Sequence, residues 1–196
     1  TWLGDTPLRG FFDLPFATTT DEVRAAFDGW IGPPVNLCYA AVDGTIGWTF
    51  AASVPARKRW RLLPQPGGDR AEGWDERVTG AELPWCEDPD EGYLATANNQ
   101  PVTPGRPDLG DDWVDGYRVG RIGDRLASRS DWTLDGLQQV QLDTYFQAWD
   151  DLVPHVDGLA PSHPDAVLAR SMLLDWDGDM GPDVPAAALA ESWIHH

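Results

Sequence analysis

The chain has 196 residues, enough for one domain with a buried core, and its 42% hydrophobic content with eleven tryptophans is that of a globular protein. Its 32 acidic and 14 basic residues give a net charge of −18, which repels nucleic-acid phosphates and anionic lipid headgroups. No apolar run approaches the roughly 20 residues of a membrane span. The composition therefore predicts neither a nucleic-acid partner nor a membrane partner.

The first predicted element is a short helix in TTTDEVRAAFDGW, residues 18–30. Thr19 and Glu22 have the spacing of a capping box, in which each side chain bonds the backbone N–H of the other residue. Apolar residues recur on one helical face, and the Gly32-Pro33-Pro34 segment is expected to end the helix.

A β-hairpin is predicted in VNLCYAAVDGTIGWTFAA, residues 35–52. Two apolar runs flank Asp43-Gly44, a pair suited to the positive φ angles of a type I′ turn. Both arms are apolar nearly throughout, so we expect the sheet to be covered on both faces and Cys38 to be a buried thiol. A disulfide between Cys38 and Cys86 stays open at this point.

The hairpin is followed by residues 53–91, which are rich in Pro, Gly, Arg and acidic residues and show no sustained period. We predict a long surface excursion here, pinned by Trp60, Trp74 and Trp85. The segment GYLATA, residues 92–97, is then predicted to return as a strand. It runs into two adjacent asparagines, whose simplest interpretation is the start of a turn.

The C-terminal half is predicted to be helical, with four helices at 117–127, 133–152, 162–177 and from about Pro185 onward. Thr133 is the expected N-cap of the second of these helices, and Ser162 begins the third. Helices thus follow the hairpin and the strand along the chain. This order of elements predicts an α+β fold.

A candidate metal motif occurs in DWDGDMGPD, where Asp175, Asp177 and Asp179 alternate as at the start of a calcium loop. An EF-hand then needs glycine at its sixth position and glutamate at its twelfth, where this chain has Met180 and Ala186. We therefore interpret the glycine between these aspartates, at position 178, as a helix cap and the three carboxylates as solvated. None of the four histidines lies in a triad-like context, and spacing alone completes no active site.

Five blocks follow one another along the chain: PPVNLCYAAVDGTIGW, LPQPG, GYLATANNQP, GYRVGRI, and WDGDM with AAALAESW. Together, from about Pro7 to Trp193, they resemble the penicillin acylase (penicillin amidase) family of N-terminal-nucleophile (Ntn) hydrolases. The resemblance implies that residues 1–196 are a single internal piece of the β-subunit of such an enzyme. The fold is then a segment of an αββα-type Ntn-hydrolase fold, with a sheet-forming part at 7–100 and a mainly helical part at 116–193.

The resemblance also implies an activity. Family members are precursors that cut themselves and expose a serine, whose own α-amino group takes up the proton during attack on an amide. That amine titrates near pH 8, so no histidine is needed. The expected substrates are small acylated amines such as penicillins, acyl-homoserine lactones or lipopeptides. The expected partner is the remainder of the precursor, the α-subunit and the rest of the β-subunit, in a periplasmic or secreted enzyme.

The asparagine pair gains a second interpretation from the resemblance. In the family, the first asparagine donates its side-chain N–H to the oxygen that becomes negative in the tetrahedral intermediate. The match assigns this role to Asn98 and leaves Asn99 to hold the turn. Losing one such donor typically lowers the rate by about a hundred- to a thousandfold.

Three further residues match family positions. Arg118, in GYRVGRI, corresponds to an arginine near the oxyanion asparagine, and a salt bridge to Asp115 or another acidic residue is an equally good interpretation. Val35 matches a residue lining the acyl pocket, although an ordinary strand residue would look the same. Asp108, in RPDLG, falls where the family places one carboxylate of a structural calcium site. The resemblance thus implies no required cofactor and suggests calcium as a structural metal.

The nucleophile is the main departure from the family pattern. Only 34 residues precede Val35, and none of them forms the expected Ser-Asn-x-Trp motif. We expect a missing upstream segment to supply this serine, so that the chain alone is inactive. Three alternatives stay open: Thr1 as an N-terminal threonine nucleophile, a non-catalytic module that keeps the fold, and an acidic calcium-binding module.

Overall fold

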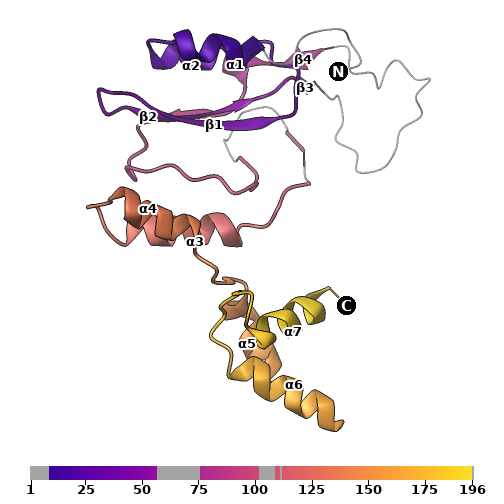
Figure 1. Ribbon diagram of the computed structural model, residues 1–196. Helices are drawn as coiled ribbons and strands as arrows, with labels where there is room; N and C mark the ends of the chain where they lie inside the picture. Colours follow the sequence, from indigo (N-terminus) through magenta and orange to yellow (C-terminus); the bar gives the residue numbers. More distant parts are fainter. Residues whose placement is uncertain (1–8, 57–75, 102–108, 111, 196) are drawn as a thin grey trace, which may run out of the picture. The chain divides into compact units, whose positions relative to one another are not determined.

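The computed structural model describes residues 9–56, 76–101, 109–110 and 112–195 (Figure 1). The chain divides into two compact units, Thr1–Asp115 and Gly116–His196. No helix in the described ranges is both long and apolar enough to cross a membrane. The predictions that concern Thr1, Trp60, Trp74 and Asp108 lie outside these ranges.

A three-stranded antiparallel sheet organises the first unit, in the order β1-β2-β5. Its strands are β1 (Val35–Ala40), β2 (Ile46–Ala51) and β5 (Trp85–Glu87). A second, two-stranded sheet pairs β3 (Val54–Pro55) with β4 (Arg77–Val78). The α+β class is therefore confirmed for this unit, with more strand structure after the hairpin than the sequence predicted.

The third strand of the main sheet is Trp85–Glu87, and residues 92–97 form no strand, so the prediction of a strand at GYLATA is wrong. Segment 84–88 occupies the second edge of β2, because Phe50 N–H donates to Pro84 O at 2.9 Å and Asp88 N–H donates to Ile46 O at 2.9 Å. The first edge of β2 is already taken by β1. No edge of β2 is left for residues 92–97.

The hairpin between β1 and β2 is confirmed, but its turn is not type I′. Ala41 N–H donates to Thr45 O at 2.8 Å, so the loop has three residues, Val42, Asp43 and Gly44. Only Gly44 of these has a positive φ, of 99°. The Asp43 carboxylate accepts a hydrogen bond from Thr45 N–H at 3.0 Å. A three-residue loop ending in a left-handed glycine is the next most common hairpin type.

Helices α1 (Arg9–Asp13) and α2 (Thr20–Ala25), with the 3₁₀ turn η1 (Leu14–Phe16), cover one face of this sheet (Figure 1). The Thr19 cap is confirmed, since its hydroxyl accepts from Glu22 N–H at 3.2 Å. The Glu22 carboxylate, however, accepts from the N–H and hydroxyl of the preceding threonine, at position 18. The helix also ends at Ala25, before the predicted stop, and Gly29, with a φ of 72°, lies outside the right-handed helical region.

Apolar side chains cover β2 on both of its faces, as the sequence predicted. The face toward α2 packs Phe27, Trp30 and Ala51 together, with Val35 and Leu37 from β1 beside them. The opposite face packs a second cluster: Phe50, Ala52 and Leu83, with Trp48, Val54, Val78, Leu109 and Trp113. Arg24 ties α2 to the first face through Tyr39 Oη at 2.9 Å and Glu87 at 3.1 Å.

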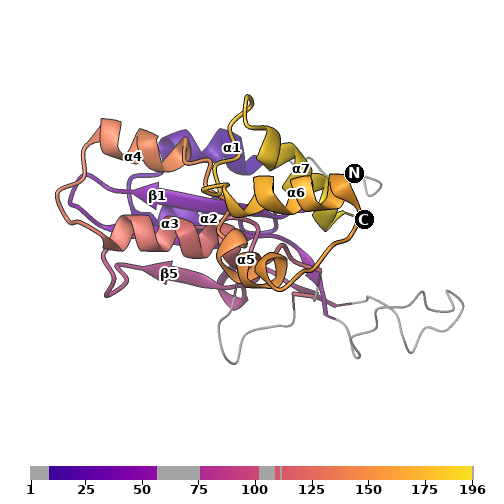
Figure 2. The ribbon, with the colours of Figure 1, turned by 90° about the horizontal axis from the view of Figure 1, so that it is seen from below.

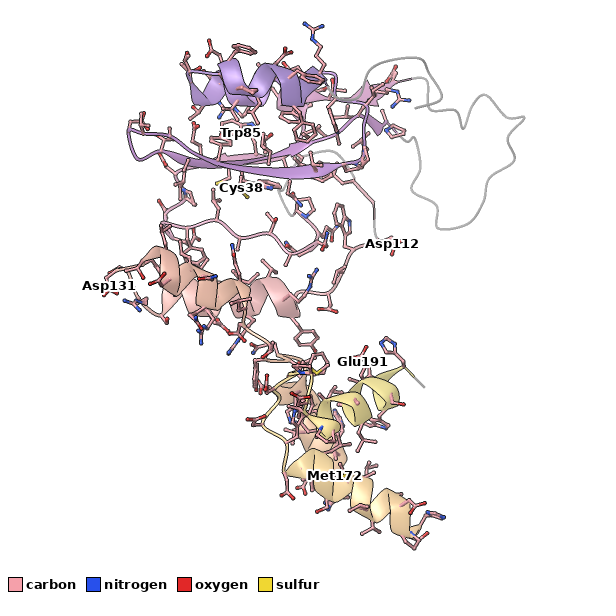
Figure 3. All side chains as sticks on the ribbon, viewed as in Figure 1. Cys38, Trp85, Asp112, Asp131, Met172 and Glu191 are labelled. Carbon is pink, nitrogen blue, oxygen red and sulfur yellow. The ribbon has the colours of Figure 1, made fainter. Side chains whose placement is uncertain are left out.

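The structure contradicts the prediction that Cys38 is buried, and it answers whether Cys38 and Cys86 form a disulfide. Cys38 is exposed rather than buried, because β1 is an edge strand; it lies on the sheet face opposite Trp85 (Figure 3). Cys38 and Cys86 both pair with Trp48, from its two sides. Their Cα atoms are thus two strand spacings apart, about 10 Å, beyond the roughly 6.8 Å limit of a disulfide. Both thiols are free.

The second unit is helical, and α5, α6 and α7 gather in one cluster (Figure 2). Its helices are α3 (Tyr117–Ala127), α4 (Leu134–Gln141), α5 (Trp149–Asp157), α6 (Pro164–Leu174) and α7 (Pro185–Ile194). The buried core unites α5, α6, α7 and the loop after α6, through Trp149, Val156, Leu173, Trp176, Ala186, Ala187 and Ala190.

The predicted long helix 133–152 is two helices, although Thr133 does cap the first by accepting from Gly136 N–H at 3.1 Å. The break at 142–148 has a tertiary cause. Phe146 N–H donates to Gly178 O and Met180 N–H donates to Thr144 O, both at 2.9 Å. This backbone pairing with a distant segment replaces helical hydrogen bonds at residues 144–146, and turns on either side of it connect α4 to α5.

The segment after α6 also differs from its prediction. Helix α6 ends at Leu174, and His163 rather than Ser162 caps its start by accepting from the N–H of residue 165. Gly178 therefore caps no helix; it has a φ of 87° and lies against the ring of Tyr145. Asp179 is half-buried and bonds the hydroxyl of Thr144, so only the other two aspartates of this motif are exposed as expected.

Gly178→Ala should destabilise the chain by about 1–3 kcal/mol, since an L-residue is strained at positive φ. Its Cβ would also come within 2.6 Å of the Tyr145 ring. Gly120→Ala is the matched control, because Gly120 lies inside α3 with open space around it. That change should stabilise α3 by about 0.5–1 kcal/mol. Urea unfolding of both variants checks the pair; equal effects would contradict the account.

Candidate functional site

The turn at Asn98-Asn99 has a fixed and unusual backbone. Asn98 has a φ of 61°, and Asp88 is the other residue besides glycine with a positive φ in the described ranges. Asparagine tolerates this left-handed conformation better than most residues because its short side chain can bond locally. The Asn98 side chain is exposed, whereas the preceding residue, Ala97, is buried.

Neighbouring groups hold this turn in place. The Asn99 side-chain oxygen accepts from Ala97 N–H at 3.1 Å, and its side-chain N–H donates to Gln100 O at 3.3 Å. The prediction that Asn99 holds the turn is confirmed by these bonds. Asn98 O accepts from Val114 N–H at 3.2 Å, which ties the turn to a second segment. The exposed Asn98 amide is thus carried by a backbone that is constrained on both sides.

The segment that supports the turn is itself anchored. Gln100 donates from its side chain to Gly110 O at 3.3 Å, and the Trp113 indole N–H donates to the same oxygen at 2.6 Å. The Trp113 ring packs edge-on against Phe50 of β2, with 6.2 Å between ring centroids. A chain of contacts therefore runs from the central strand of the sheet to the asparagine turn.

Val35, the predicted acyl-pocket residue, opens β1 opposite Ala51. It is half-buried and packs against the cluster of Phe27, Trp30 and Ala51. Its neighbour Asn36 accepts a hydrogen bond from the Trp48 indole N–H at 2.9 Å on the other face of the sheet. Val35 thus has the core contacts of a strand residue, and a role in lining an acyl pocket stays a prediction.

Arg118 lies in the first turn of α3 with an exposed side chain. It belongs to the second unit, whereas Asn98 and Val35 belong to the first. Asp108 lies outside the described residues. Across the described ranges, no group of three or more His, Cys, Asp or Glu side chains is arranged to hold a metal ion. Calcium stays a prediction.

A polar cluster beside Arg118 was missed by sequence reasoning. Arg121 donates from Nε and Nη2 to Asp143 Oδ2 at 3.1 and 2.9 Å, and Arg125 Nε lies 3.5 Å from the same oxygen. Tyr145 N–H donates to the other oxygen, Oδ1, at 2.9 Å. The Arg121 guanidinium also lies over the Tyr145 ring, 4.5 Å from its centroid. We call Arg121, Arg125, Asp143 and Tyr145 the α3 clamp.

The electrostatics of Asp143 follow from these contacts. Burial by itself raises the pKa of this carboxyl, since its side chain is only 11% exposed. The hydrogen bond from Tyr145 N–H and the positive charges of Arg121 and Arg125 outweigh burial and hold the pKa below its ordinary value. Asp143 is therefore an ionised, partnered carboxylate at neutral pH.

The comparison with protein families decides the family of the chain. All of residues 1–196 match the family described as penicillin amidase. The chain belongs to the penicillin amidase family. This agrees with the resemblance carried by the asparagine pair and by the other sequence blocks.

Relatives and a solved structure agree with this membership. The chain is 32% identical over 188 residues to a penicillin acylase 2 proenzyme of a Pseudomonas species, and 33% identical over 141 residues to the acyl-homoserine lactone acylase QuiP of Pseudomonas aeruginosa. These matches cover 89% and 71% of this chain, which spans only 23% and 16% of the two relatives.

The fold is similar to a solved thermostable penicillin G acylase from Alcaligenes faecalis, with a TM-score of 0.72 at 22% identity. That match covers 96% of this chain and 36% of the other. The predicted fold class, a mixed α+β segment of the penicillin acylase type, is thereby confirmed.

The α3 clamp gives a pH-dependent prediction. Asp143→Asn should lower the free energy of unfolding by about 1–3 kcal/mol at pH 7, the usual range for hydrogen bonds to charged groups. Because the folded-state pKa is depressed, the stabilisation is full above about pH 4 and is lost as the pH falls through that pKa. The gap between variant and wild type should therefore close in acid.

Urea unfolding of the chain at several pH values between 7 and 3 measures this gap. Asp157→Asn is the control, since Asp157 pairs with Arg170 at the same 2.9 Å but its side chain is 73% exposed. Such an exposed pair contributes about 0–1 kcal/mol. A gap for Asp143→Asn that does not change with pH would contradict the assignment of the clamp to the ionised carboxylate.

Proposed function

We propose that this chain is a segment of a self-processing amide hydrolase, and that Asn98 is a hydrogen-bond donor of its oxyanion hole. The observation that carries the proposal is the left-handed turn at Asn98, with an exposed amide on a constrained backbone. Family membership supports hydrolysis of an acyl-amide bond. A donor fixed before the reaction needs no reorganisation when charge develops, which is the condition for strong stabilisation of a transition state.

The proposed reaction begins with an N-terminal serine from a segment of the precursor outside this chain. Its hydroxyl oxygen attacks the amide carbonyl while its own α-amino group takes the proton. The carbonyl oxygen becomes negative in the tetrahedral intermediate and accepts a hydrogen bond from the Asn98 side-chain N–H. The C–N bond then breaks, the proton passes to the leaving amine, and water hydrolyses the acyl-serine that remains.

The other matched residues have supporting roles in this proposal. The family resemblance assigns to Arg118 a positive guanidinium that favours the developing negative charge. Val35 contributes an apolar wall to the acyl pocket, and Asp108 is one ligand of a structural calcium ion. The substrates are small acylated amines, of the kind that the names of the penicillin acylase and acyl-homoserine lactone acylase relatives indicate.

Asn98→Gly in the full-length protein should lower kcat by about a hundred- to a thousandfold, the usual cost of losing one oxyanion donor. Glycine adopts positive φ without strain, so the thermal midpoint should fall less than it does for Asn98→Ala. Asn98→Ala should lose kcat equally but also lose about 1–2 kcal/mol of stability, because alanine is strained at this φ. Steady-state hydrolysis of a chromogenic acyl anilide and thermal unfolding measure both quantities.

Asp88→Gly is the matched control for that experiment. Asp88 also has a positive φ, of 45°, in the first unit, and its carboxylate accepts from Ile46 N–H at 2.9 Å. Removing this side chain should cost some stability and leave kcat unchanged. If Asn98→Gly kept nearly full turnover, the oxyanion role would be wrong, and the chain would be a non-catalytic module or use other donors.

The 196-residue chain purified alone should not hydrolyse the same anilide, because the proposed serine and its α-amino group are supplied by another segment. The control is the same assay after acetylation of the Thr1 amine. Hydrolysis by the untreated chain that disappears on acetylation would contradict the proposal and assign the nucleophile to Thr1.

A further inference from the structure

We propose that Asp143 is a positioning residue for Arg118 and acts through helix α3. The inference rests on the proposed function, because it concerns the place of an arginine at that site. Asp143 lies in the 142–148 segment between α4 and α5. It is not one of the candidate residues that the sequence predicted. Its contacts with α3 come from the described side chains of the second unit alone.

Helix α3 carries three arginines at regular spacing. Arg118, Arg121 and Arg125 occur at i, i+3 and i+7, so they share one face of the helix. Asp143 binds the second and third arginines of this stripe. Arg118, which the family resemblance assigns to the site, is therefore one helical turn from Arg121, which Asp143 binds.

Polar contacts hold α3 in its unit. No side chain of α3 is fully buried, so its position depends on polar contacts more than that of α5 or α7 does. One such contact is the Tyr117 hydroxyl, which donates to Asp151 Oδ2 at 2.8 Å in an exposed setting. Another is the α3 clamp, whose Asp143 side chain is 11% exposed and uses both of its oxygens.

Tyr145 and the neighbouring Phe146 connect the clamp to the buried core of the unit. Tyr145, whose ring stacks on Arg121, lies in the segment that pairs with residues 178–180. The neighbouring Phe146 ring stacks on Trp176 of the buried core, with 6.5 Å between centroids. The clamp thus connects α3 to the buried core of its unit, through the Asp143 carboxylate and through the contact of Arg121 with the Tyr145 ring.

A neutral side chain cannot supply the negative charge of the Asp143 carboxylate. Three guanidinium groups on one helix face repel one another, and Asp143 compensates two of them. Asn keeps the size of Asp and can still accept from Tyr145 N–H. Its side chain, however, carries no charge and turns an amide N–H group or a neutral oxygen toward Arg121. We infer that Asp143→Asn releases Arg121 and lets the first turn of α3, with Arg118, shift.

A double-mutant cycle in the full-length enzyme tests this inference. Asp143→Asn and Arg118→Ala should each lower kcat per active site by about tenfold, and the double variant should be no slower than Arg118→Ala alone, the signature of two residues acting as one unit. Titration with a covalent serine reagent counts the processed active sites. KM should change less than twofold, because Arg118 is proposed to act on the transition state.

Two further variants separate positioning from stability. Asp157→Asn removes an ion pair of the same 2.9 Å length in the same unit, away from α3, and should leave kcat unchanged. Arg121→Lys breaks the clamp from its other side and should reproduce the effect of Asp143→Asn if that variant fails to fold or to process. It too should add nothing in the Arg118→Ala background.

The outcomes are distinct. Additive losses in the double variant would overturn the inference and make the clamp a stability element only. A fully active Arg118→Ala enzyme would also overturn it, by removing Arg118 from the site, while the oxyanion proposal would still stand on the result for Asn98→Gly. If Asn98→Gly kept full activity and the cycle still showed coupling, the oxyanion role would be wrong and the clamp would remain.

Discussion

Strand β2 is hydrogen-bonded along both edges and packed on both faces, and the first unit is arranged around it. β1 takes one edge and residues 84–88 take the other. Because both edges are filled, residues 92–97 cannot join this strand and run past the sheet to the asparagine turn. Phe50 of the same strand packs against Trp113, whose indole N–H bonds Gly110 O and so steadies the segment behind the turn. The sheet thereby determines where an exposed amide can be held.

The second unit depends in the same way on one long-range pairing. Residues 144–146 bond to residues 178–180, and this pairing ends α4, turns the chain into α5 and brings Asp143 against α3. Gly178 has the left-handed conformation that this approach requires, with the Tyr145 ring directly against it. A polar clamp and an aromatic core therefore share one short segment of chain.

Local signals predicted much of this structure. The Thr19 and Thr133 caps, the hairpin at 35–52 and the helix at 117–127 follow from residues close together in the sequence, so periodicity and capping chemistry were sufficient. The order of elements was also enough to give the α+β class. Family membership then agreed with the resemblance that the sequence blocks carried.

The errors share a physical cause, which is competition between distant segments. Residues 92–97 have the composition of a strand, but both edges of β2 are occupied, and Cys38 is apolar in context but lies on an edge strand. The helix expected at 133–152 breaks because distant carbonyl and N–H groups bind its middle. For the proposed site, Asn98 was assigned from the family resemblance, and the arginine stripe on α3 was readable as spacing. Its partner Asp143 was hidden inside the expected helix.

The residue type at position 98 has to meet two demands. It must adopt a φ of 61° at low cost, and in the proposed enzyme it must donate a hydrogen bond. Glycine meets the first demand and most other donors fail it, whereas asparagine meets both. The sequence feature that looked like an ordinary turn is thus compatible with a role in chemistry, and Asn99 provides the turn chemistry beside it.

The most direct test of the account is a crystal structure of the full-length protein with a boronic acid bound covalently to the nucleophile, which places an oxygen where the oxyanion forms. The measured quantity is the distance from Asn98 Nδ2 to that oxygen. The account predicts about 2.7–3.1 Å, the range for an oxyanion-hole donor. An Asn98 side chain that lies beyond hydrogen-bonding distance, with other donors around the oxygen, would contradict it.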